Sequence, residues 1–227
     1  VPEGHGGSGF GYVGAGLIQE AIGRNLSLSP MLSTAILAAT ALLVGGTDEQ
    51  KANYLPKIAS GDLLMALASD EKSRHMPNHV ATTAAASGNG FKLNGTKSFV
   101  LDGHVADKLI VAARTAGADG DTDGITLFLV DPKAAGVSIA RQSMVDSRNA
   151  AKVVLNDVQV DGAESPIERI AAVVAPDGGS ARSAIAAWGA AARATEVLVA
   201  LVGRPERVQP LEEARRALAG VADVVVI

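Results

Sequence analysis

The hydrophobic pattern of this 227-residue chain changes its period twice, and the period limits which secondary structure each segment can form. In residues 1–62, apolar side chains such as Val13 and Leu17 recur at helical spacing, which predicts helices. In residues 63–161, short runs of β-forming residues alternate with turn residues, which predicts an antiparallel β-sandwich or barrel. Residues 162–227 return to helical spacing. We therefore predict an α+β multidomain chain in which helical segments flank a β domain.

Turn residues divide the predicted β domain into strands. We expect strands at residues 63–69, 80–86, 91–93, 96–101, 108–113, 125–130, 137–141 and 152–155. Asn94-Gly95 is a dipeptide typical of two-residue hairpin loops, so it predicts a hairpin between two of these strands. Asp131-Pro132 predicts a second turn.

Helix boundaries in the first block carry their own signals. Ser29-Pro30 predicts a helix N-terminus, with Ser at the N-cap and Pro at the first helical position, followed by an apolar helix over residues 31–44. Gly45-Gly46 predicts the end of that helix. Thr47 and Gln50 have the spacing of a capping box, which predicts the start of another helix.

Composition excludes several classes of protein. The formal net charge is −4, which argues against a nucleic-acid binder, because such proteins carry a basic stripe. The chain has no cysteine, which excludes a disulfide scaffold, a thiolate nucleophile and metal or Fe–S sites built on cysteine. No apolar run reaches the ~18–20 residues of a membrane span, and no signal peptide is recognisable. We therefore expect a cytoplasmic protein with no membrane span.

Two motifs have the spacing of ligand-binding loops, and we interpret both as ordinary loops. Residues 9–14 read G-x-G-x-x-G, but the residues before them are typical of a loop, not of the strand that a dinucleotide site requires. Asp119, Asp121 and Asp123 have the spacing that opens a calcium-binding EF-hand loop. However, Val130 stands where that loop needs a bidentate Glu, which favours a solvated hairpin tip.

Other residue patterns do not predict a metal site or a hydrolase. His75 and His79 are four residues apart, but Pro77 between them prevents the helical geometry that would bring both to one metal ion. No G-x-S-x-G motif occurs, so serine hydrolase chemistry has no support. The apolar stretch 184–202 contains charged residues, which favours a bundle helix over a membrane element.

Several segments together resemble the acyl-CoA dehydrogenase family of flavoproteins. The opening residues 1–11 are similar to the family's "PE-x-x-GG-x-G" entry to an early helix. Residues 47–61 are similar to its "G-[ST]-x-x-QK-x-x-[YW]-LP-x-[LI]-A-x-G" segment. Asn94-Gly-Thr-Lys-Ser-Phe-Val-Leu-Asp-Gly103, followed by Ala106-Asp107, is similar to "NG-x-K-x-[FW]-[IV]-x-[DN]-G-x-x-AD". The segments lie in the family's order and at its intervals over residues 1–161.

The resemblance implies both a reaction and a cofactor site. Family members form an α,β-double bond in an acyl-CoA thioester: a carboxylate removes the α-proton while FAD accepts the β-hydride. A strand and an aromatic side chain of the β domain contact the flavin ring in this family. The residues that the resemblance places there are Ala66, Leu67, Ala68, Ser69, Phe99 and Leu101.

Four positions in and beside the second of these strands need further interpretation. An aromatic residue such as Phe99 would be buried in an aliphatic sandwich whether or not it met a flavin. Leu101 lies two residues on and is expected on the same face of the strand, where the family usually has Ser or Thr, so one flavin hydrogen bond is lost. Lys97 and Asp102 are expected to shape the hairpin rather than to touch a ligand.

The sequence departs from the family pattern in the segments that would meet the substrate. The family has a glycine-rich loop at residues 70–79, whereas this chain has no glycine there, and Lys72 and Arg74 are left to bind a phosphate by charge. Arg207 and Gln209 match part of a segment that contributes to the neighbouring subunit's FAD. No residue matches the catalytic Glu, so we assign no catalytic residue.

Alternatives to the dehydrogenase reading stay open at this point. The chain could be a non-catalytic subunit of a heteromeric acyl-CoA dehydrogenase, a related flavin oxidase or monooxygenase, or a structural module without flavin. The dehydrogenase reading implies an acyl-CoA substrate, an electron-transfer acceptor and a homo- or hetero-oligomer. Because the chain begins at Val1 and ends in the apolar stretch Asp223-Val-Val-Val-Ile227, we expect a shortened chain.

Overall fold

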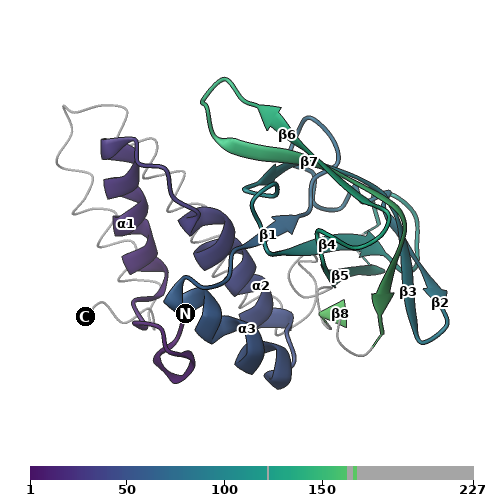
Figure 1. Ribbon diagram of the computed structural model, residues 1–227, viewed down its shortest axis with the longest axis horizontal. Helices are drawn as coiled ribbons and strands as arrows, with labels where there is room; N and C mark the ends of the chain where they lie inside the picture. The colour runs from purple at the N-terminus through teal and green to yellow at the C-terminus, as the bar shows by residue number, and fades with distance from the viewer. Residues whose placement is uncertain (122, 163–165, 168–227) are drawn as a thin grey trace. The chain divides into compact units, whose positions relative to one another are not determined.

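A computed structural model describes residues 1–121, 123–162 and 166–167 of the chain. The chain divides into two compact units, Val1–Ala187 and Trp188–Ile227, and every described residue belongs to the first. The helices predicted beyond residue 167 therefore lie outside the described residues. Figure 1 shows the described part as a group of helices followed by a curled sheet, in the order that the hydrophobic pattern predicts.

The helices form where the apolar spacing and the capping residues predict them. They are the short η1 (Glu3–His5), α1 (Gly11–Asn25), the π-helix η2 (Met31–Ala38), α2 (Ala39–Gly45) and α3 (Asp48–Ser60). The N-cap of η2 is Pro30, so the prediction of Ser29 at the N-cap and Pro30 at the first helical position is wrong by one residue; the hydroxyl of Ser29 still accepts a hydrogen bond from Met31 N at 3.2 Å. The capping box at the start of α3 is complete, because Thr47 Oγ1 accepts from Gln50 N and Gln50 Oε1 accepts from Thr47 N.

The strands form one mixed sheet rather than the purely antiparallel arrangement we predicted. They are β1 (Met65–Ala68), β2 (Thr83–Ser87), β3 (Gly90–Leu101), β4 (Lys108–Arg114), β5 (Ile125–Val130), β6 (Val137–Ser143), β7 (Asn149–Asp161) and β8 (Pro166–Ile167). Their order is β6-β7-β3-β2-β4-β5-β8, and β1 also pairs with β4. β1 and β2 run parallel to β4, because the chain reverses direction twice between β2 and β4, once into β3 and once out of it.

The predicted hairpin at Asn94-Gly95 is wrong. Both residues lie inside β3, and the turn between β2 and β3 falls at Gly88-Asn89. Asn94 instead pairs with Asp157 of β7 through its side chain, at a bulge in the β3–β7 register. Gly95 is needed for close approach, because a Cβ at this position would lie 2.7 Å from Thr82 Cα.

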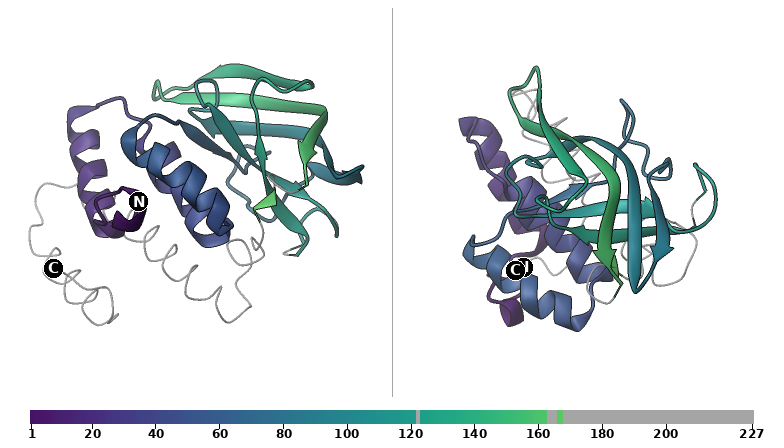
Figure 2. Two further views of the ribbon diagram at one scale, coloured as in Figure 1. Left: turned by 60° about the horizontal axis from the view of Figure 1, so that its bottom comes forward. Right: turned by 45° about the vertical axis from the view of Figure 1, so that its right-hand side comes forward.

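Two apolar clusters explain why both faces of the central strands are hydrophobic. Residues that alternate along β1 and β4 point to opposite faces: Met65 and Ile110 pack with helix residues such as Leu42, whereas Ala66 and Val111 pack inside the curve of the sheet. Figure 2 shows this curve as an open half-barrel with the helices against its outer side. β4 is therefore buried on both faces, as its unbroken apolar sequence requires.

Two neighbouring hydroxyls of η2 join the helices to two different strands. Ser33 Oγ donates to Asp102 Oδ2, just after β3, at 2.6 Å. Thr34 Oγ1 donates to Met65 O at 2.9 Å and accepts from Met65 N at 3.1 Å, at the start of β1. Both hydroxyl residues are buried. Asp102 thus ties the end of β3 to a helix, a role that the sequence did not predict.

We expect Thr34→Val to destabilise the fold by about 1–3 kcal/mol, because it leaves the N–H and C=O of Met65 buried without a partner. The substitution keeps the shape of the side chain and removes only the hydroxyl. Thr34→Ser is the control, since it keeps the hydroxyl and should retain most of the stability. Urea unfolding of the three proteins measures the difference. Equal midpoints for wild type and Thr34→Val would contradict the prediction.

Candidate functional site

One edge of β1 carries backbone groups that pair with no other strand among the described residues. Leu64 O accepts hydrogen bonds from Asp107 N and Lys108 N, so the backbone N–H and C=O groups of residues 64, 66 and 68 point toward β4. The backbone groups of Met65 point the other way and bind Thr34. By the same alternation, the N–H and C=O of Leu67 point to the open edge. The Ala66 and Ala68 side chains are fully buried inside the sheet.

The middle of β3 bulges close to the end of this edge. Ser98 N donates to Asp70 O at 2.8 Å, and the β3–β7 register shifts between Lys97 and Val100. Phe99 lies in the bulge with a left-handed φ of 55°, a conformation that costs about 1–2 kcal/mol for a non-glycine residue. Phe99 is 39% exposed, so the expectation that it would be buried in any case is wrong.

The bulge also interrupts the alternation that placed Leu101 and Phe99 on one face. Regular β-pairing resumes at Val100 and Leu101, opposite Ala151 and Ala150 of β7. Leu101 is half-buried, and it offers no hydroxyl to a ligand. The predicted flavin residues of β1 and β3 therefore meet at the Ser69–Asp70 end of β1, with Phe99 as the exposed aromatic side chain.

A buried ion pair holds this junction together, and sequence reasoning missed it. Lys97 of β3 is fully buried, and its Nζ donates to Glu71 Oε1 at 2.7 Å and to Ser69 O at 3.2 Å. The other contacts of Glu71 are with the backbone, since its carboxylate accepts from Ala81 N and Thr82 N. Lys97 therefore does not shape a hairpin. A lysine inside a predicted strand, two residues from Phe99, was the available signal.

Burial and attraction act in opposite directions on the two charges. Burial alone raises the pKa of the Glu71 carboxyl, but the charge and hydrogen bond of Lys97, with hydrogen bonds from Thr82, lower it below its ordinary value. Burial lowers the pKa of the Lys97 ammonium group, and the attraction of Glu71 opposes only part of that shift. The attraction between the two groups thus favours the charged form of each.

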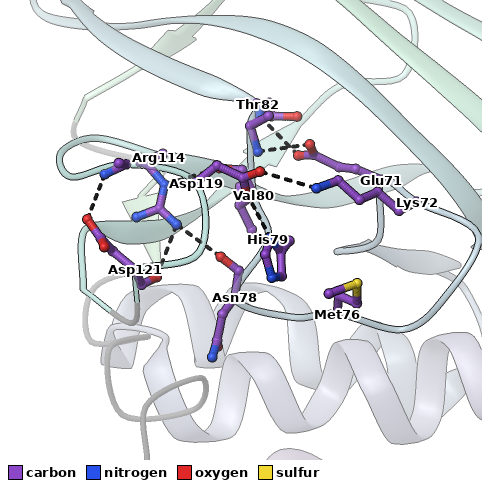
Figure 3. A network of polar contacts seen from close by, with 12 residues as sticks. Glu71, Lys72, Met76, Asn78, His79, Val80, Thr82, Arg114, Asp119 and Asp121 are labelled. Carbon is purple, nitrogen blue, oxygen red and sulfur yellow. Dashed lines mark hydrogen bonds and ion pairs between the residues drawn. The ribbon is translucent and has the colours of Figure 1, made fainter.

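The loop that follows β1 is held by ion pairs of its own. At its start, His75 Nδ1 lies 3.0 Å from Asp70 Oδ1, and this hydrogen bond raises the pKa of His75. Lys72 Nζ donates to Asp119 Oδ2 at 3.2 Å, which lowers the pKa of Asp119, and His79 lies 3.5 Å from the same carboxylate (Figure 3).

These contacts change the prediction for the two cations of the loop. Lys72, which we predict to bind substrate, forms an ion pair with Asp119. Arg74, predicted with it, is exposed and has no hydrogen-bond or ion-pair partner among the described residues. Arg74 is therefore the loop cation that is available for a phosphate.

Arg114 binds the end of the same loop, just before β2. Arg114 is 6% exposed, and its guanidinium group donates to five backbone carbonyl oxygens, those of Asn78, Val80, Ala116, Asp121 and Asp123. Figure 3 shows Arg114 beside Asn78, Val80 and Asp121. The EF-hand-like segment is therefore a turn whose carbonyls bind an arginine. Asp121 Oδ2 accepts from Ala118 N at 2.7 Å within it.

Metal sites and membrane spans are both absent from the part of the chain that the structure describes. Within residues 1–121, 123–162 and 166–167, no group of three or more His, Asp and Glu side chains has the geometry to hold a metal ion. In the same part of the chain, no helix is both long and apolar enough to cross a bilayer. Arg207 and Gln209, the predicted FAD contacts toward a neighbouring subunit, lie outside the described residues.

Comparisons with known proteins assign the two parts of the described region. The family model for the acyl-CoA dehydrogenase N-terminal domain matches residues 1–62, and the model for the acyl-CoA dehydrogenase middle domain matches residues 65–158. Acyl-CoA dehydrogenase FadE27 of Mycobacterium tuberculosis is 32% identical over 163 residues, which cover 72% of this chain and 41% of that protein.

Solved structures share the fold. A chain of the ChsE4-ChsE5 complex from Mycobacterium tuberculosis superposes with a TM-score of 0.66 at 31% identity, covering 76% of this chain and 45% of that chain. A glutaryl-CoA dehydrogenase from Mycobacterium smegmatis in complex with FADH2 gives a TM-score of 0.53 at 26% identity, covering 66% of this chain and 39% of that chain.

The chain spans about two fifths of the length of the curated relatives that it matches first. The two family models together cover more than half of this chain, in the family's order, and the helices and curled sheet that they match are the ones described above. The chain belongs to the acyl-CoA dehydrogenase family.

Proposed function

We propose that this chain binds FAD along the open edge of β1, beside Phe99, as part of an acyl-CoA dehydrogenase. The observation that carries the proposal is the N–H and C=O of Leu67 on that edge, which have no partner among the described residues. A flavin ring presents alternating hydrogen-bond donors and acceptors along its polar edge, which the backbone of a strand can match. The solved relative with FADH2 supports this choice of ligand.

The residues present fit such a ring in three respects. The Leu67 backbone offers one donor and one acceptor, and the half-exposed Ser69 adds a hydroxyl at the end of the same strand. The exposed Phe99 ring offers an apolar face. The side chains of Ala66 and Ala68 are buried inside the sheet, so they would not touch the flavin. These residues would contribute by holding the backbone of β1 in place.

The proposed reaction is the α,β-dehydrogenation of an acyl-CoA thioester. Bound FAD would supply the hydride acceptor for that reaction, and the protein would supply orientation and charge. In this chain, Arg74 is the side chain that we propose for a phosphate of the substrate, since it is exposed and unengaged. Lys72 would first have to leave Asp119.

A second candidate is a non-catalytic subunit of a heteromeric dehydrogenase. Among the described residues, the carboxylates next to the open edge are Asp70 and Glu71. Asp70 is bound to His75, and Glu71 is bound to Lys97, so neither is free to remove a proton. A solved relative is described as a complex of ChsE4 with ChsE5, which supports a subunit role of this kind.

We expect Phe99→Ala to weaken FAD binding about tenfold, because an aromatic contact is worth about 1 kcal/mol or slightly more. Titration of FAD with the protein, followed by flavin fluorescence and the visible flavin spectrum, measures the dissociation constant. Phe91→Ala is the matched control for loss of a ring, since Phe91 packs against Phe128 at a centroid distance of 5.1 Å, away from the bulge. Equal affinity for wild type and Phe99→Ala would contradict the placement of the ring.

The same preparation distinguishes the two candidate functions. A flavin-loaded chain that oxidises acyl-CoAs with ferrocenium as the electron acceptor supports the dehydrogenase. A chain that binds FAD without oxidising any acyl-CoA, and gains activity with a partner subunit, supports the non-catalytic role. A colourless chain that takes up no FAD overturns both.

A further inference from the structure

Phe99 is held in its unusual conformation by a side chain that is remote in sequence. Gln142 of β6 accepts a hydrogen bond from Phe99 N at its Oε1, at 2.8 Å. On the other side of the bulge, Ser98 N donates to Asp70 O. Two consecutive amides in the bulge are thus bound by different segments, and neither bond belongs to the regular ladder of β3.

The register of the sheet explains how Gln142 reaches Phe99. β7 lies between β6 and β3, and its Ala150 pairs with Gln142 on one side and with Leu101 on the other. Residues paired in this way share one face of the sheet, so the glutamine side chain passes over the small side chain of Ala150. Ala150 is fully buried, and a methyl group leaves room for this crossing.

We propose that Gln142 is a positioning residue for the flavin site: it fixes the left-handed backbone of Phe99 and thereby presents the ring to FAD. The proposal rests on the proposed function, because it takes Phe99 as a flavin contact. A non-glycine residue keeps a left-handed conformation only where its surroundings over-determine it, and residues of this kind gather at ligand sites. Without the Gln142 acceptor, the bulge loses one of its two fixed amides.

The test separates the backbone role from the flavin role. The variants are Gln142→Met, which keeps the length of the side chain and removes the acceptor, and Gln142→Glu, which keeps an acceptor. Gln159→Met is the matched control, since Gln159 of β7 donates to Ser87 O, at the end of β2. Each full-length protein is examined by hydrogen exchange of the Phe99 amide without flavin, and then by FAD titration.

We expect Gln142→Met to speed exchange of the Phe99 amide and to raise the dissociation constant of FAD, each by about tenfold. Gln142→Glu should restore the slow exchange, and Gln159→Met should match wild type in both measurements. The proposal is overturned if wild type binds FAD and Gln142→Met binds it equally well, or if the Phe99 amide exchanges at the wild-type rate in Gln142→Met. If wild type takes up no FAD, the proposed function fails, and the exchange rates still report whether Gln142 fixes the backbone of Phe99.

Discussion

Lys97→Met is expected to destabilise the protein by about 3–5 kcal/mol, the largest effect we predict for a single substitution. Lys97 is fully buried and Glu71 is 8% exposed at its side chain, so the substitution leaves a carboxylate in the protein interior without its counter-charge. Ser69 O also loses its hydrogen bond. Urea unfolding gives the free energy of unfolding of both proteins.

Lys51→Met makes the same chemical change at an exposed pair. Lys51 lies 3.8 Å from Asp48, whose side chain is fully exposed, so this variant should lose less than about 1 kcal/mol. The double variant Lys97→Met with Glu71→Gln should recover part of the loss, because the amide leaves no unpaired charge and its one oxygen can still accept from either Ala81 N or Thr82 N. If Lys97→Met is as stable as wild type, the pair does not stabilise the fold.

The penalty of Lys97→Met should shrink in acid. In wild type the pKa of Glu71 is lowered on folding, so its contribution to stability is present above the unfolded value of 4.5 and is lost as the pH falls through the folded value. In Lys97→Met, burial acts without the opposing charge and raises the pKa of Glu71, so this carboxyl is neutralised first. Unfolding free energies measured between about pH 7 and pH 4 should converge. A penalty that is constant over this range would contradict the pairing.

Arg114→Met is expected to destabilise the protein by about 2–4 kcal/mol, because hydrogen bonds from a charged donor are among the stronger ones. The guanidinium group serves five carbonyl oxygens from two loops, and no shorter or neutral side chain can reach them all. The loss should be local as well as global. Exchange of the Gly120 amide, which donates to Asn78 O between those loops, should become faster.

Two variants calibrate this effect. Arg114→Lys keeps the charge but replaces the planar fork with one ammonium group, so it should lose most of the same stability. Arg141→Met removes an exposed arginine of β6 whose bond is to Asn149 Oδ1, and it should change stability by less than about 1 kcal/mol. An Arg114→Lys protein with wild-type stability would show that charge alone, and not the fork, holds the loops.

Local signals predicted the parts of the fold that neighbouring residues determine. The capping box of Thr47 and Gln50 and the strand at residues 125–130 are confirmed. Each depends on side chains and backbone groups only a few positions apart, or on alternation that is visible in sequence. The order of helices and strands follows for the same reason.

Features set by distant partners could not be predicted in this way. Asn94-Gly95 has the composition of a turn, but its partner Asp157 lies in another strand and draws it into β3. The exposure of Phe99 depends on a bulge fixed by Gln142 and Asp70. The ion pair of Lys72 depends on Asp119, which is separated from it in the sequence by β2, β3 and β4. In each case the deciding contact joins residues more than 25 positions apart.

The open edge of β1 also bears on aggregation. An exposed strand edge is a template for another strand, and proteins limit this hazard by keeping such edges short. β1 has four residues, and the outward groups of Met65 are already bound by Thr34, so the Leu67 pair is the remaining unpaired segment of this edge among the described residues. That is too short to start a ladder with a second polypeptide, yet long enough for the polar rim of a small planar molecule. By binding Met65, the hydroxyl of Thr34 thus shortens the unpaired edge of β1 and limits intermolecular β-sheet growth.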